Sequence, residues 1–110
     1  MLEEISSDRG FKCPIIDFAQ ALVSHNYQSM RGRLSLRSAT PRTYFYEFVH
    51  RTESLPWPKW TNTMHGYEIE YVFGIPFSPV FADNFYRFND AERELSDLMM
   101  TYWANFARTG

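Results

Sequence analysis

The sequence predicts a mixed α/β fold with three helices and one strand. Residues 14–24 and 90–108 repeat apolar side chains at the three-to-four spacing of an amphipathic helix. Between them, residues 43–50 are β-branched and aromatic on both faces, which is typical of a strand covered on both sides of a sheet. A strand of this kind requires neighbours, and we expect the neighbouring strands to be missing from this segment.

The composition is that of a folded globular segment, since 45% of the 110 residues are hydrophobic and 22% are charged. One domain at most fits this length. The 11 Lys and Arg against 13 Asp and Glu give a net charge of −2, which argues against nucleic-acid binding. We expect neither a membrane span nor a signal peptide, because no apolar stretch is long enough and residues 1–10 lack a basic start.

The first helix is predicted over residues 14–24. Pro14 suits the first turn of a helix, where its missing N–H costs no hydrogen bond. The apolar face consists of Ile15, Ile16, Phe18, Ala19, Leu22 and Val23. Residues 25–43 then mix serine, arginine, glycine and proline without periodicity, which predicts an exposed loop or insertion.

Two further helices are expected after the strand. Pro56 and Pro58 exclude regular structure around Trp57, and a short helix begins just after His65, on an apolar face made of Ile69, Val72 and Phe73. Gly74, Pro76 and Pro79 end it. The last helix, over 90–108, has Asn89 as its N-cap and Glu92 in the position that completes a capping box.

His65 is the candidate for chemistry. A histidine in a turn is a good general base because its ordinary pKa, about 6.5, lies near neutral pH, although an ordinary exposed or core histidine is the alternative. The five glycines do not form the G-x-S-x-G motif of a serine nucleophile, and Cys13 lacks an electropositive setting. No phosphate-binding loop or zinc spacing occurs, so we expect no cofactor and no metal.

Three blocks of sequence carry a family resemblance: W-P-K-W (57–60), M-H-G-Y-E-I-E-Y-V-F-G-I-P (64–76) and T-Y-W-A-N-F-A-R-T-G (101–110). In order and spacing they resemble the C-terminal third of the cholinesterase and type-B carboxylesterase family. The resemblance covers roughly residues 7–110 apart from 25–43. It implies that residues 1–110 are an incomplete C-terminal segment of a type-B carboxylesterase domain, with a partial α/β-hydrolase fold.

The resemblance also implies roles for single residues. His65 matches the histidine of a Ser-His-Glu triad, which accepts the proton of the serine and returns it to the leaving alcohol. Tyr67 matches a tyrosine of the gorge wall near the cationic head group of the ester, and Glu68 matches a buried glutamate near the triad. Trp57 and Trp60 match aromatic residues beside the gorge, although packing of the loop that carries His65 is an equal alternative.

Other parts of the family pattern lie outside these residues. The serine, the oxyanion loop and the acidic triad member belong upstream, and Cys13 matches a cysteine whose disulfide partner follows Gly110 in relatives. We therefore expect an internal piece of a larger enzyme, whose partners are the remainder of the hydrolase domain and a small-molecule ester. The resemblance implies an extracellular or cell-surface parent and allows a homo-oligomer.

Three functions stay open for the parent protein. The first is a serine carboxylic-ester hydrolase, cholinesterase-like, which acts on acetylcholine or a related choline ester through an acyl-enzyme. The second is a non-catalytic, neuroligin-like adhesion protein on the same scaffold, and the third is an inactive translated fragment. The intact H-G-Y-E-I-E block, residues 65–70, favours the enzyme over the adhesion protein.

Overall fold

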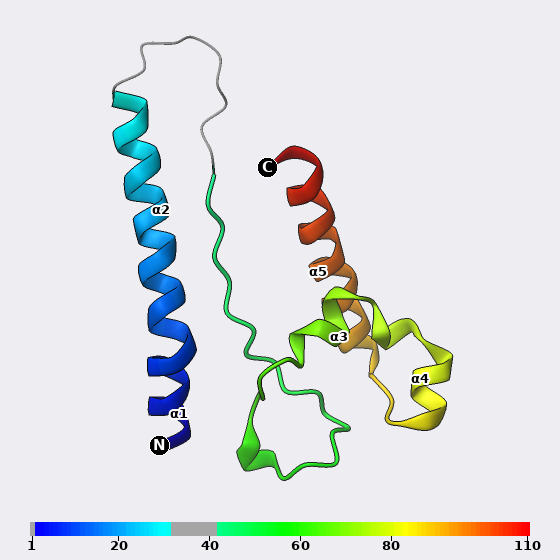
Figure 1. Cartoon of the computed structure of the whole chain (residues 1–110). Helices are drawn as coiled ribbons and strands as arrows, with labels where there is room; N and C mark the ends of the chain where they lie inside the picture. The colour runs from blue at the N-terminus through cyan, green and yellow to red at the C-terminus, as the bar shows by residue number, and fades with distance from the viewer. Residues whose placement is uncertain (1, 32–41) are drawn as a thin grey trace. The chain divides into compact units, whose positions relative to one another are not determined.

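A computed structural model describes residues 2–31 and 42–110. The chain divides into two units, Met1–Tyr46 and Glu47–Gly110, each of which is described by itself. Within the described residues, helices and turns account for all regular structure, as Figure 1 shows. No helix in this part of the chain combines the length and apolarity that a bilayer crossing requires.

The described part of the first unit begins with one helical run over residues 2–31. It starts with α1 (Leu2–Ser7), continues through the π-helical turn η1 (Asp8–Lys12) and extends along α2 (Cys13–Arg31), drawn from blue to cyan in Figure 1. The helix predicted over 14–24 is confirmed but extends further at both ends. Since no proline or glycine occurs between residues 15 and 31, nothing in the sequence breaks the helix there.

The loop expected over 25–43 does not begin at residue 25. Residues 25–31 belong to α2, and residues 32–41 lie outside the described part of the chain. Residues 42 and 43 have neither helical nor strand structure. Polar residues such as His25 and Ser29 were read as loop-forming, yet each tolerates a helix when no breaker is present.

The strand predicted over 43–50 is wrong for this chain. Residues 42–50 carry no strand, and the described residues contain none anywhere. Strand structure is defined by hydrogen bonds to a neighbouring strand, so a segment with the right side chains stays irregular when no partner is present. The β-branched and aromatic pattern therefore identifies a segment that could pair, and this chain supplies nothing for it to pair with among the described residues.

The core of the second unit lies where α3 (Glu68–Val72) packs against α5 (Asp90–Thr109). Tyr71, Phe88 and Met99 form the buried cluster, and the aromatic rings of Phe48, Phe81 and Tyr86 lie around it. The Ser96 hydroxyl donates to the Tyr71 carbonyl over 2.7 Å, which joins the two helices inside the core.

Both helices of this core were predicted. The capping box of α5 is confirmed, because the Asn89 side chain accepts from the Glu92 N–H at 2.9 Å while the Glu92 carboxylate accepts from the Asn89 N–H at 2.8 Å. The short helix after His65 is confirmed as α3. It ends at Val72, and the chain turns at Gly74, whose φ of 70° lies in the left-handed region that glycine adopts without strain.

Three short elements of the second unit were not predicted: the 3₁₀ turns η2 (Lys59–Thr61) and η3 (Ile75–Phe77), and α4 (Pro79–Asn84). Pro79 was read as a terminator, but it begins α4. The Ser78 hydroxyl accepts from the Phe81 N–H at 3.2 Å, so Ser78 and Pro79 form an N-cap followed by proline in the first turn.

We expect Gly74→Ala to destabilise the second unit. A Cβ at this position would lie 2.9 Å from the Met100 sulfur, and the positive φ would be strained by any side chain. The free energy of unfolding should fall by about 1–2 kcal/mol. Urea unfolding followed by circular dichroism measures this change. Gly10→Ala is the control, because Gly10 has no atom within 4 Å of its Cβ position; equal losses in both variants would contradict the prediction.

Candidate functional site

His65 lies in the turn between η2 and α3. The turn bends at Gly66, whose φ of 89° favours glycine, and it closes through the Tyr67 N–H, which donates to the Met64 carbonyl at 3.4 Å. The side chain of His65 is exposed in this chain. The turn thus places an imidazole at the surface of the second unit, directly before a helix that is anchored in the core.

Two of the predicted site residues are brought together. The indole N–H of Trp57 donates to the Tyr67 hydroxyl at 2.8 Å, which links the proline-bounded loop to the residue two positions after His65. Trp60 lies on η2 and is 69% exposed. Of the two tryptophans, Trp57 has the contact that connects it to the histidine turn.

Arg51 holds the same loop from its other side. Its guanidinium donates to three backbone carbonyls, those of Thr52 at 3.0 Å, Leu55 at 3.4 Å and Trp57 at 2.6 Å. Sequence reasoning missed this residue. The available signal was an arginine next to a segment with two prolines, where backbone carbonyls lack ladder partners and need another donor.

The residues on either side of Arg51 are fixed to the core. The Thr52 hydroxyl shares a 2.7 Å hydrogen bond with the Tyr71 hydroxyl, and both side chains are buried. His50 Nε2 lies 3.2 Å from Glu92 Oε1, and the Glu53 N–H donates to the same oxygen at 2.7 Å. Glu92, only 1% exposed, therefore binds this segment as well as capping α5.

Two glutamates of α3 lie in different surroundings. Glu68 is half-buried in the first turn, where its negative charge faces the positive end of the helix dipole. Glu70 accepts from the Tyr86 hydroxyl at 2.5 Å, and its second oxygen is buried with no hydrogen-bond partner among the described residues. Burial raises the pKa of Glu70 above its ordinary value, although the hydrogen bond from Tyr86 opposes this.

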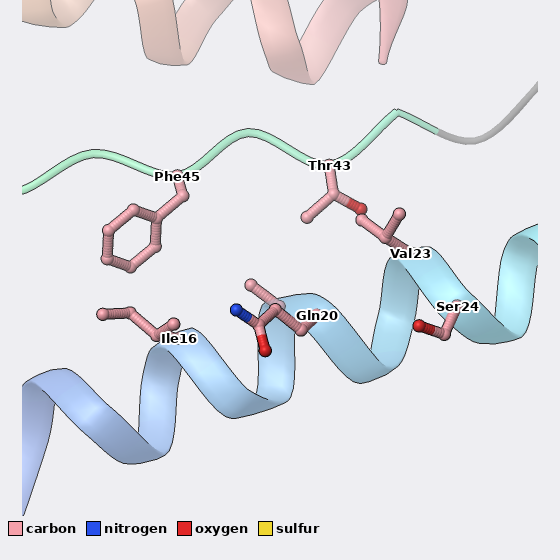
Figure 2. Close-up of a pocket in the computed structure, with 7 residues that line it drawn as sticks. Ile16, Gln20, Val23, Ser24, Thr43 and Phe45 are labelled. Atoms are coloured by element: carbon pink, nitrogen blue, oxygen red, sulfur yellow. The ribbon is translucent and has the colours of Figure 1, made fainter.

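The first unit holds the remaining predicted residue. Cys13 is exposed and forms no disulfide in the described part of the chain. Figure 2 shows a groove in this unit, lined by Ile16, Gln20, Val23, Ser24, Thr43 and Phe45 together with Ala19. None of the predicted site residues lines it. Among the described residues, no three His, Cys, Asp or Glu side chains lie together in a group that could hold a metal.

Comparison with known proteins decides the family. The model of the carboxylesterase family matches residues 1–110, the whole length of the chain. The chain belongs to the carboxylesterase family. Membership implies an α/β-hydrolase fold for the complete domain, whereas the described residues of this chain contain helices without a strand.

Similar proteins include several that bear the name acetylcholinesterase. This carboxylesterase segment is 38% identical over 109 residues to the acetylcholinesterase of Bungarus fasciatus and 41% identical over 109 residues to that of Gallus gallus. It is 35% identical to acetylcholinesterase 1 of Caenorhabditis elegans. Each alignment covers 99% of the chain but only 12% to 15% of the relative. No solved structure matches the chain.

Glu70→Gln tests the electrostatics of α3. The raised folded-state pKa of Glu70 means that its neutral form is favoured by folding, so its contribution to stability is present below the unfolded pKa and is lost as pH rises through the folded pKa. A glutamine does not ionise. We therefore expect the variant to gain stability relative to the wild type as the pH rises above the ordinary pKa of a carboxyl group.

Urea unfolding at several pH values measures this difference. Glu94→Gln, which removes an exposed carboxylate from α5, controls for the loss of one negative charge. Parallel stability curves for the wild type and Glu70→Gln would contradict the prediction.

Proposed function

We propose that this chain is the C-terminal part of the catalytic domain of a serine carboxylic-ester hydrolase of the cholinesterase type. In the parent protein the substrate is acetylcholine or a related choline ester, which is hydrolysed through an acyl-enzyme. The nucleophilic serine and the acidic triad member come from the remainder of the hydrolase domain. The parent acts at the cell surface or outside the cell.

One observation carries the proposal: His65 stands in an intact H-G-Y-E-I-E block within a chain that matches the carboxylesterase family throughout its length. Relatives at 38% and 41% identity bear the name acetylcholinesterase. The turn geometry is compatible with the proposed role, because His65 lies at the surface of this segment, where the rest of the domain would supply the serine.

His65 is the general base in this proposal. Its imidazole accepts the proton of the serine hydroxyl as the oxygen attacks the ester carbonyl, and it then returns the proton to the leaving alcohol. The negative charge of Glu68 stabilises the imidazolium that forms between these steps. The ring of Tyr67 presents an aromatic face to the quaternary ammonium of a choline ester, together with the neighbouring indole of Trp57.

The non-catalytic adhesion protein remains the alternative outcome. It shares the scaffold, so a correctly folded parent without esterase activity would support it. A test of His65 as the base has to supply a serine nucleophile from another protein.

A chimera provides that serine. Residues 1–110 replace the matching segment of the Gallus gallus acetylcholinesterase, and hydrolysis of acetylthiocholine is measured. We expect the chimera to be active and His65→Ala to lower kcat by a factor on the order of 10⁴ or more, because triad members act as a unit.

His25→Ala is the matched control, since His25 is an exposed histidine on α2. It should leave kcat within about twofold, as expected for an exposed histidine that matches no triad member. Circular dichroism confirms that both variants fold. A folded His65→Ala chimera with the turnover of the wild type would refute the assignment of the base.

The isolated chain should be catalytically silent. Its residues contain no G-x-S-x-G motif, and the proposed base has no nucleophile to act on. Hydrolysis of p-nitrophenyl acetate by the purified chain, compared with its His65→Ala variant, tests this expectation. A saturable rate that disappears in the variant would contradict it.

A further inference from the structure

We propose that Arg51 is a positioning residue that holds the aromatic wall formed by Trp57 and Tyr67, and that it thereby sets the affinity for the cationic part of the ester. Arg51 acts through Trp57, whose carbonyl oxygen lies 2.6 Å from a terminal guanidinium nitrogen of Arg51. This inference rests on the proposed function, because it assigns a substrate-facing role to the wall.

First, the backbone on both sides of Arg51 is held in place by the core. The hydroxyl of Thr52 is hydrogen bonded to Tyr71, which is fully buried, and the side chain of His50 is in contact with the buried carboxylate of Glu92. Arg51 therefore starts from a backbone that is fixed to both α3 and α5. A long side chain holds its partner in place only if its own backbone is held.

The second step concerns the backbone of Trp57. Pro56 and Pro58 have no N–H to donate, so this part of the loop has few backbone hydrogen bonds of its own. Other side chains hold the loop before and after Trp57: the Ser54 hydroxyl donates to the Arg87 carbonyl, Asn89 donates to the Glu53 carboxylate at 2.9 Å, and the Thr61 hydroxyl donates to the Pro58 carbonyl at 2.8 Å. The Arg51 guanidinium holds the Trp57 carbonyl itself.

The third step is the link to the substrate side. Trp57 donates its indole N–H to the hydroxyl of Tyr67 at 2.8 Å, and Tyr67 follows His65 by two residues. The Arg51 guanidinium therefore fixes the Trp57 backbone, and the Trp57 indole in turn fixes the Tyr67 hydroxyl. Loss of the Arg51–Trp57 contact loosens the Trp57–Tyr67 contact, and the ring of Tyr67 then loses its fixed orientation.

The chemistry of the contact requires arginine. A guanidinium presents several N–H groups in a planar fork, and here its two terminal nitrogens reach the carbonyls of Thr52, Leu55 and Trp57. Lysine carries a single nitrogen at the end of a flexible chain and cannot bridge these acceptors in the same way. The role is thus separable from the positive charge itself.

Steady-state kinetics of the chimera tests the proposal. We expect Arg51→Ala to raise KM for acetylthiocholine about fivefold, because the substrate loses the cation–π interaction with a correctly oriented aromatic ring. The kcat value should stay within about twofold of the wild type. KM for phenyl acetate, which has no cation, should change by less than about twofold. Arg51→Lys should resemble Arg51→Ala, and Trp57→Phe, which removes the indole N–H, should have the same selective effect.

The double variant Arg51→Ala/Trp57→Phe shows whether Arg51 acts through Trp57 or whether the two residues affect substrate binding independently. If Arg51 acts through Trp57, the double variant raises KM no further than either single change. Arg87→Ala is the matched control, because Arg87 is exposed and its guanidinium pairs with Asp83. Multiplicative effects, a full rescue by lysine, or an equal rise in KM for both esters would overturn the proposal.

Hydrogen–deuterium exchange of the same chimera gives a readout that does not depend on activity. Peptides covering residues 55–67 should exchange faster in Arg51→Ala, while peptides from α5 should not change. Unchanged exchange over 55–67 would overturn the role of Arg51. A folded chimera that fails to hydrolyse acetylthiocholine would refute the proposed function, and in that case exchange alone decides whether Arg51 holds the loop.

Discussion

The buried carboxylate of Glu92 is the interaction on which the second unit depends. One carboxylate accepts from the N–H of Asn89, where it caps α5, and from the N–H of Glu53, where it fixes the segment before the proline loop. A buried carboxylate is costly unless its oxygens are hydrogen bonded, and here backbone donors on two separate segments satisfy it. The capping residue Glu92 therefore also joins the start of α5 to the segment that leads into the loop of the candidate site.

A series of contacts links this buried carboxylate to the candidate site. The core fixes residues 50–53, Arg51 extends from them to the Trp57 carbonyl, and Trp57 reaches Tyr67 beside the His65 turn. The turn itself is anchored on its far side by α3, whose Tyr71 lies in the core. The histidine is thus presented by a loop whose two ends are both attached to buried groups, as expected where a reactive side chain must be held in place.

The apolar faces of the helices are largely uncovered in the described residues. Phe18 of α2 is 65% exposed, and on α5 the exposed large apolar side chains are Leu98, Tyr102, Trp103 and Phe106. Amphipathic periodicity is typical of a helix that packs on an apolar surface, and much of these faces stays exposed in this chain. Such faces agree with the comparison, in which the chain spans 12% to 15% of its relatives.

Features that depend on neighbouring residues were predictable from the sequence: the capping box at Asn89 and Glu92, the short helix after His65, the turn at Gly74 that follows it and the family blocks. Its local patterns misplaced what depends on distant partners. The segment 43–50 has the side chains of a strand but, among the described residues, no strand to pair with. Pro79 was expected to end a helix, but it begins α4, for which Ser78 is the N-cap. Only the tertiary structure brought Arg51 to Trp57 and His50 to Glu92, because such contacts join residues whose approach is decided by packing of the core and not by any local pattern.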